Sequence, residues 1–309
     1  MTSTYNYVLF HHPCNDGFLS LVLLREAGIL DSNCYIRGAA PDLNTLPPNI
    51  SGKNVIIVDL NLKKKIIMDI IGVSKSVLFI DHHINKDDVH KISHKNFASI
   101  YDPRKSACMI IWLKYFKNKK IPTLIKYIDD NDRMANQYNE TSIFISAYEV
   151  HYNTENVSTR DKIIEKMDKV ASLLKNNKEV EKLLVVGKYY SLYKYAITKK
   201  SLNNFEHLKL IGPNNVVLDL IVSNIGGFCS RLVASQFQMF DSCDLSITWY
   251  YHVGVKGIVC ICRSKTNTIT WLLQMYDAEG QPRAGTFKCA GISNIYDWFN
   301  AHNRKMRQR

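Results

Sequence analysis

Short apolar runs alternate with longer amphipathic segments through the first half of the chain. Three of the runs have the length of β-strands and lie at residues 7–10, 55–58 and 76–80. Segments of helix length open between them, at Gly17 and at Leu62. Because strands and helices in alternation are typical of βαβ units, the pattern predicts a parallel sheet.

The periodicity extends this interpretation to the rest of the chain. A further strand is predicted at residues 97–101, and helices at 107–115 and ending near 128. Apolar residues recur with a 3.6-residue period from Ile163, which predicts a long helical region over 159–199 with a capping-box-like start. Strand-like runs return at residues 216–222, 245–251 and 257–262.

Together these elements predict an α/β protein of two domains. We expect an N-terminal domain with a parallel sheet over residues 1–155, a helical connector over 156–204 and a smaller α/β domain over 205–309. A chain of 309 residues has the length for two ordinary domains, and its 46% of hydrophobic residues can supply their cores.

The most informative chemical feature is the tripeptide Asp81-His82-His83, which follows the third apolar run. Parallel strands end at the same edge of a sheet, where ligands commonly bind. Carboxylates gathered there repel one another unless a cation lies among them. Carboxylate oxygen and imidazole nitrogen suit Mn, Mg, Fe or Zn, with no thiol involved. The side chains expected at this edge are His11 or His12, Asp16, Asp59, Asp81 and His82.

Each of these residues taken alone has a simpler interpretation. A single Asp after a strand is commonly a helix cap or a turn residue, and a single His there is commonly a hydrogen-bonded surface residue. Three strands of one βαβ series that all end in such groups favour a metal site instead.

Two later features bear on the same edge. The acidic segment Asp129-Asp130-Asn131-Asp132 follows the helix that ends near 128; alone it is typical of a solvated loop, but beside the other acids it is a candidate ligand segment. Ser106 precedes the helix predicted at 107–115 and is a candidate cap for it. The first-turn amides of that helix are alternatively expected to face an anion.

Composition narrows the class of protein. Lys and Arg number 40 against 28 Asp and Glu, and the net charge of +12 favours polyanionic partners, although lysine runs are often only solvated surface. The eight cysteines include no C-x-x-C pair, which excludes zinc-knuckle and thioredoxin motifs. No apolar stretch reaches the ~18 residues of a membrane helix, and signal-peptide features are lacking. We therefore expect a cytoplasmic protein without membrane association.

Cations and small residues stand together in the last third of the chain, in Arg263-Ser264-Lys265 and in residues 283–291. Small residues let backbone amides approach a phosphate, and Arg binds phosphate through two nitrogens. Either segment alone is equally an ordinary surface turn. The candidate substrate-binding residues are Arg263, Lys265, Gly285, Thr286 and Lys288.

On these residues the chain resembles the DHH phosphoesterase superfamily over most of its length. The first and third motifs are specific, whereas the C-terminal match, on residues 263–265 and 284–291, is weaker. The segments that resemble the four N-terminal motifs are residues 11–18 with Cys14 before Asp-Gly-Phe, Val58-Asp59, Asp81-His82-His83 and residues 127–132.

The resemblance implies hydrolysis of phosphoesters or phosphoanhydrides in a cleft between two domains, with one or two Mn²⁺ ions and Mg²⁺ as the alternative. His83 would act on phosphate oxygens beside the metals, and Asp81 would support the imidazoles. The spacing of four residues to Asp16 favours His12 as a ligand, while the Cys-containing branch of the family favours His11. The residues mapped as the other metal ligands are Asp16, Asp59 as a bridge, His82 and Asp130.

Two positions depart from the family pattern. Phe18 stands where many members carry a second Asp, which puts two-metal occupancy in question. Thr286 stands where a glycine run usually ends in His, and Lys288 is the candidate to compensate.

We therefore expect a metal-dependent phosphodiesterase that uses metal-activated water. Its expected substrates are short oligonucleotides, cyclic dinucleotides or single-stranded nucleic acid. The alternative is a non-catalytic nucleic-acid or nucleotide-binding protein that keeps the DHH fold; Phe18 and Thr286 favour it, and the clustered acids weigh against it. A monomer and a homodimer are both compatible with the sequence.

Overall fold

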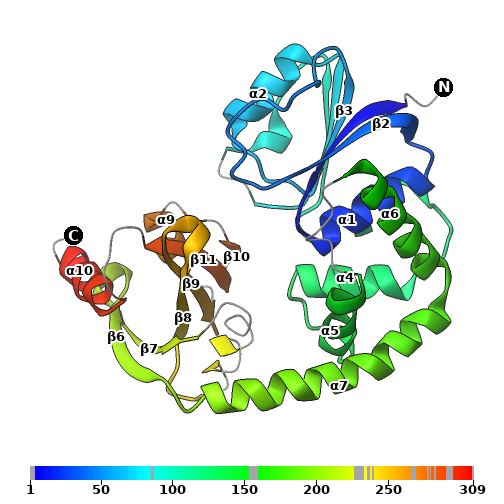
Figure 1. Cartoon of the computed structure of the whole chain (residues 1–309). Coiled ribbons are helices and arrows are strands. Elements are labelled where there is room, and N and C mark those ends of the chain that lie inside the picture. Colours follow the sequence, from blue (N-terminus) through cyan, green and yellow to red (C-terminus); the bar gives the residue numbers. More distant parts are fainter. Residues whose placement is uncertain are drawn as a thin grey trace. The chain divides into compact units, whose positions relative to one another are not determined.

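The computed structural model describes residues 4–84, 87–152, 159–225, 233–234, 237–238, 240–265, 269–276, 278, 280–281, 283–289 and 295–307. The chain divides into two compact units, Met1–Ser191 and Leu192–Arg309, which are described one at a time (Figure 1). The domain boundaries expected near residues 155 and 204 stay a prediction.

A five-stranded sheet forms the centre of the first unit, with strand order β2-β1-β3-β4-β5 and parallel pairing throughout. The predicted α/β class is confirmed. Its strands are β1 (Tyr5–His11), β2 (Leu30–Ala39), β3 (Asn54–Val58), β4 (Ser76–Asp81) and β5 (Phe97–Tyr101). Only β2 has no counterpart among the predicted strands, because Cys34 is its one fully buried residue and no apolar run marks this edge strand.

The helices of the first unit follow the predicted order, with α5 added. The predicted long helical region consists of two helices, α6 and α7, separated at Asn176. The Thr159 hydroxyl caps the first by accepting a hydrogen bond from the Lys162 amide at 3.4 Å. The helices are α1 (Asn15–Glu26), α2 (Lys64–Val73), α3 (Ala107–Tyr115), α4 (Thr123–Asp132), α5 (Thr141–His151), α6 (Arg160–Lys175) and α7 (Asn177–Ser201), which continues into the second unit.

Helices cover both faces of the parallel sheet (Figure 1). Leu9, Ile57 and their neighbours pack against the apolar face of α2. The residues that alternate with them, such as Val8 and Val58, pack against α1, α3 and α6 on the opposite face. Because both faces are buried, the central strands are continuous apolar runs rather than alternating ones.

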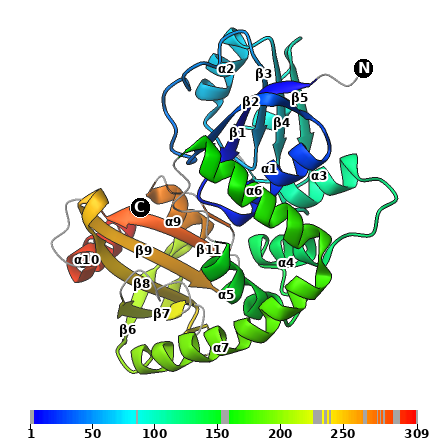
Figure 2. The same ribbon diagram turned by 45° about the vertical axis from the view of Figure 1, so that its right-hand side comes forward.

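The second unit contains a six-stranded sheet of order β10-β11-β9-β8-β7-β6, in which only β7 and β8 pair in parallel (Figure 2). Its strands are β6 (Glu206–Ile211), β7 (Val217–Asn224), β8 (Leu245–His252), β9 (Gly257–Ser264), β10 (Gly280–Gln281) and β11 (Ala284–Cys289). Helices α9 (Thr270–Met275) and α10 (Ile295–Arg307) contribute to the core on one face of this sheet. No helix among the described residues is long and apolar enough to cross a membrane.

Candidate metal centre

The candidate site lies where β1, β3 and β4 end at the carboxyl edge of the parallel sheet. β1 ends at His11, Asp59 follows β3, and Asp81 is the last residue of β4. The strands are in register at this level, since Phe10 pairs with Val58 and Val58 with Ile80. The register therefore brings the side chains after the three strands into one group.

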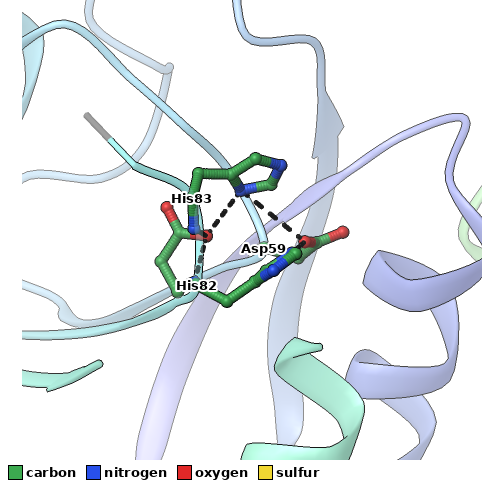
Figure 3. A group of neighbouring side chains, drawn as sticks. Asp59, His82 and His83 are labelled. Carbon is green, nitrogen blue, oxygen red and sulfur yellow. Dashed lines mark hydrogen bonds and ion pairs between the residues drawn. The ribbon is translucent and has the colours of Figure 1, made fainter. Parts of the chain in front are cut away.

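Asp59 is the centre of this group and is fully buried. Its Oδ1 atom lies 3.2 Å from Nε2 of His82 (Figure 3). Its Oδ2 atom lies 3.4 Å from Nδ1 of His11 and 3.2 Å from Sγ of Cys14. The two oxygens thus face two different sets of groups. The backbone of Asp59 is left-handed, with φ of 55°, a conformation that non-glycine residues adopt mainly at turns and functional sites.

His82 joins Asp59 to two further carboxylates. Its Nε2 atom lies 3.3 Å from Oδ2 of Asp132 and 3.9 Å from Oδ2 of Asp16. One ligand-type atom from each of these three residues falls within 4.8 Å of the others. Carboxylates and an imidazole at this spacing form a donor set of the kind that holds divalent cations.

Asp16 is held in place by another helix. The amides of Ala107 and Cys108, at the start of α3, donate to its two oxygens at 2.7 and 2.8 Å. The amide of Ser106 donates to Asp129 at 2.7 Å, and the Ser106 hydroxyl makes no cap. The anion that these first-turn amides face is therefore supplied by the protein's own carboxylates.

Asp81 orients the second histidine of the tripeptide. Its Oδ1 atom accepts hydrogen bonds from the His82 amide and from Nδ1 of His83, both at 2.7 Å (Figure 3). The imidazole of His83 thus keeps Nε2 directed away from Asp81. The side chain of His83 is 31% exposed, which leaves it accessible from solvent, whereas Asp81 is buried.

The carboxylates of the group lie close together, and this shifts their pKa values. Burial, followed by the charges of Asp59 and Asp132, raises the pKa of Asp16 well above its usual range. Burial and Asp59 likewise raise the pKa of Asp132 to about 6. Burial also opposes ionisation of Asp59, but the neighbouring imidazoles of His11 and His82 outweigh it and lower the pKa of that carboxyl.

The pKa values of the two imidazoles rise, although burial alone would lower them. Burial lowers the pKa of His82, yet Asp59 and Asp132 outweigh it and raise that pKa to about 9. Asp81 and Asp59 similarly raise the pKa of His83 to about 10 against the effect of burial. The carboxylates thus draw positive charge into the site, which fits a role in holding divalent cations.

The structure leaves two of the predicted ligands outside the group. The ring of His12 lies 5.8 Å from the ring of Phe10, and its Cβ packs over Gly38 of β2. The carboxylate of Asp130 accepts hydrogen bonds from the amides of Gln137 and Tyr138 at 2.7 and 3.3 Å and from the Thr141 hydroxyl. The predicted residues that the structure brings together are His11, Asp16, Asp59, Asp81, His82 and His83.

Asp132 enters the group in place of Asp130, although the prediction selected Asp130 from the same segment. The helix does not end near 128 but continues as α4 through Asp132. Asp132 therefore follows Ile128 by one helical turn, and Ile128 is buried. Helical phase extended past 128 is the signal that would have identified it.

Gly17 allows the close approach of α1 to the two strand ends. A Cβ at this position would lie 2.4 Å from the backbone oxygen of His11 and 3.1 Å from Oδ2 of Asp59. Phe18, the next residue, is fully buried and lies edge-on to Phe10 in the core. The position at which the sequence departs from the DHH pattern that it resembles is therefore a core position in this chain.

The predicted substrate-binding residues lie in the second unit. Arg263 pairs with Ala284 across β9 and β11, so Thr286 and Lys288, two and four residues further, share its face of the sheet. Gly285 is on the opposite face, where a Cβ would lie 2.5 Å from Leu273. The Lys265 ammonium donates to the carbonyl of Phe240. Residues 290–291 of the predicted segment lie outside the described residues.

Comparison with known proteins supports the fold. No protein-family model matches the chain. The chain is 29% identical over 260 residues to the uncharacterized protein R106 of Acanthamoeba polyphaga mimivirus, a match that covers 79% of this chain and 57% of that protein. The chain thus spans little more than half the length of this relative.

Two solved structures are similar to this chain in fold. The pGpG-specific phosphodiesterase PggH from Vibrio cholerae superposes with a TM-score of 0.51 and 16% identity, covering 99% of this chain and 98% of that one. An exopolyphosphatase-related protein from Bacteroides fragilis gives a TM-score of 0.50 and 14% identity, covering 98% and 91%. This chain therefore has the fold of these two proteins.

Proposed function

We propose that this protein is a metal-dependent phosphoesterase that hydrolyses phosphodiester bonds in short oligonucleotides, cyclic dinucleotides or single-stranded nucleic acid. The observation that carries the proposal is the buried Asp59 carboxylate, with His82 3.2 Å from one oxygen and His11 3.4 Å from the other. A carboxylate so placed is suited to hold two divalent ions a short distance apart. The fold shared with a phosphodiesterase supports the same class.

The residues that would hold Mn²⁺ or Mg²⁺ come from four segments of the first unit. His82 lies beside one oxygen of Asp59 and groups with Asp16 and Asp132, and His11 lies beside the other oxygen. Backbone amides of α3 fix Asp16, so its carboxylate needs little reorganisation to bind a cation. The chemistry that a bound divalent cation supplies is activation of water and neutralisation of phosphate charge.

His83 is proposed to act on the substrate directly. Its Nδ1 proton is committed to Asp81 at 2.7 Å, which leaves Nε2 as the ring atom available to a phosphate oxygen. In the metal-free chain the pKa of His83 is raised to about 10, chiefly by Asp81 against burial, which favours a proton on Nε2. A protonated imidazole there would donate to the oxygen on which negative charge develops. Asp81 is then a positioning residue that acts through His83.

Substrate recognition by the second unit is also part of the proposal. Arg263, Thr286 and Lys288 share one sheet face, and the chain carries a net charge of +12. Cations distributed in this way favour a substrate with more than one phosphate. Lys265 and Gly285 complete the proposed set, and a cytoplasmic location is proposed with it.

The test is a hydrolysis panel with the full chain: a short RNA, a short DNA, a cyclic dinucleotide, the linear dinucleotide pGpG and pyrophosphate. Each is incubated with Mn²⁺ and with chelator. We expect chelator-sensitive cleavage of at least one nucleotide substrate. His83→Gln should reduce it strongly, whereas His94→Gln, an exposed histidine of the same unit, should not.

No cleavage of any substrate by folded, metal-binding protein would overturn the enzymatic proposal. It would favour the alternative, a nucleotide-binding protein without catalysis. Binding of the same substrates that survives chelation would support that alternative further.

A further inference from the structure

Cys14 occupies the cap position before α1, but its side chain does not cap the helix. Ser, Thr, Asp and Asn are preferred at this position because their oxygens accept hydrogen bonds from first-turn amides. The backbone of Cys14 is extended, with φ of −150° and ψ of 136°, and its side chain makes no such bond. Sγ lies instead 3.2 Å from Oδ2 of Asp59. The thiol is therefore directed at the candidate metal centre.

A second ligand-type atom faces the same oxygen. Nδ1 of His11 lies 3.4 Å from Oδ2 of Asp59, is buried, and makes no hydrogen bond within the described part of the chain. A buried ring nitrogen in this state is costly unless something else binds it. One atom from each of His11, Cys14 and Asp59 falls within 4.8 Å of the others.

Two separations in this group are close to those found in the ligand shell of a cation. At ordinary Zn–N, Zn–O and Zn–S bond lengths, tetrahedral ligands stand about 3.4 Å apart for N and O and about 3.6 Å apart for S and O. The observed separations are 3.4 Å for His11 to Asp59 and 3.2 Å for Cys14 to Asp59. Both separations lie within a few tenths of an ångström of the values expected for ligands of one ion.

We propose that the Cys14 thiolate is a metal ligand that completes a second ion position with His11 and Asp59. This inference rests on the proposed function of the centre as a metal site and deepens it. The first ion position is formed by Asp16, His82 and Asp132, of which His82 faces the other oxygen of Asp59. Cys14 thus supplies, from another position in the first motif, the donor that the buried Phe18 cannot provide.

The two positions differ in the metal that they favour. Oxygen and imidazole donors suit Mn²⁺ and Mg²⁺, whereas a thiolate shifts the preference toward Zn²⁺, Fe²⁺ or Co²⁺. Binding at the second position breaks the S–H bond, releases its proton to solvent and forms a sulfur–metal bond. The Cys14 thiol is thus the feature that would distinguish the second position from the first in metal preference.

The experiment is a Co²⁺ titration of the full chain followed by near-ultraviolet absorption. Thiolate bound to Co²⁺ gives an intense sulfur-to-metal charge-transfer band that oxygen and nitrogen donors do not give. We expect the band in the wild type, its loss in Cys14→Ser, and its retention in Cys34→Ser. Cys34 is the control because it is a free cysteine of the same unit whose thiol bonds to the carbonyl of Tyr35 rather than to an acid of the centre.

A second readout measures affinity without catalysis. Zn²⁺ affinity should fall by at least about tenfold in Cys14→Ser, since loss of a direct ligand costs no less than loss of a supporting residue. Mn²⁺ bound at the first position should change less. Circular dichroism of each variant verifies that it folds.

Two results would overturn the inference: a charge-transfer band that survives in Cys14→Ser, or Co²⁺ binding to the wild type with no band. Its failure is distinguishable from failure of the proposed function. A band without hydrolysis of any panel substrate would support Cys14 as a ligand and overturn the proposed enzymatic function. Hydrolysis without the band would support the enzymatic function and overturn Cys14 as a ligand.

Discussion

The two units place their functional candidates in different ways. In the first unit the acids and imidazoles stand at strand ends and helix starts, where backbone amides hold Asp16 and a buried carboxylate orients His83. In the second unit Thr286 and Lys288 are exposed side chains along a strand. Groups fixed by buried contacts suit chemistry, whereas exposed cations suit adjustable contact with a phosphate chain. The comparison predicts large effects from changes in the first set and small ones in the second.

The largest effect is expected at Asp59. Asp59→Ala removes the carboxylate that faces both ion positions, so hydrolysis should fall by more than about 10³-fold. Turnover with Mn²⁺ measures the loss, and a thermal melt verifies the fold. Asp59→Asn is the matched control for shape, because Asn tolerates the left-handed backbone found here. Near wild-type turnover in either variant, with metal present, would contradict the proposed centre.

Two acids of one helix separate chemistry from stability. Asp132→Asn should lower kcat/KM by about 100-fold with little change in stability, because Asp132 faces His82 at 3.3 Å. Asp130→Asn should instead cost about 1–3 kcal/mol of unfolding free energy, because its carboxylate accepts three hydrogen bonds from the loop and helix that follow α4. Kinetics and urea unfolding of both variants measure the contrast; the opposite pattern would restore Asp130 as the ligand.

Metal affinity should depend on pH in a defined direction. The pKa of His82 is raised from 6.5 to about 9, since Asp59 and Asp132 outweigh burial, and a cation at Nε2 must displace that proton. Affinity for Mn²⁺ should therefore rise by up to about tenfold per pH unit between pH 7 and 9. Calorimetry in two buffers of different ionisation enthalpy counts the released protons, and affinity that is constant over this range would exclude His82 as a ligand.

The same shift has a stability consequence in the metal-free chain. A raised folded-state pKa means that the protonated imidazole stabilises the fold. That contribution is complete below about pH 6.5 and is lost as the pH rises through about 9. Bound metal should reduce the loss, because the cation then neutralises the same carboxylates.

The smallest effect is expected on the cation face of the second unit. Lys288→Ala should raise KM about two- to fivefold with kcat unchanged, because an exposed cation contributes little per contact. Lys209→Ala, a cation on β6 paired with Asp219, is the control.

If single strands are the substrate, KM should also rise steeply with salt; a flat response would indicate a small substrate.

Most of the first unit could be predicted because its central strands are buried on both faces. Residues 55–58 and 76–80 were recognised as apolar runs and form β3 and β4. The amphipathic edge strand β2 was missed, because hydrophobicity does not distinguish it from loop. Strand ends and the tripeptide Asp81-His82-His83 located the site edge without the structure.

The sequence did not determine which of two nearby residues of the same type lies in the candidate site. His11 and His12 are adjacent at a strand end, so their directions differ by the local backbone geometry alone. Asp130 and Asp132 differ by two residues on a helix, and the choice depends on where α4 ends. Element boundaries are the least certain part of any such prediction, and these assignments depended on them.

The absence of a Cβ atom at Gly17 sets the width of the candidate centre. Position 17 admits no side chain, since even a methyl group would meet the His11 carbonyl at 2.4 Å and Asp59 at 3.1 Å. Any larger residue would wedge α1 away from the two strands and stretch the ligand shell beyond the reach of a small ion. A designer who wished to fit a larger cation into the candidate centre would therefore begin at Gly17, which is no ligand, rather than at the proposed ligands.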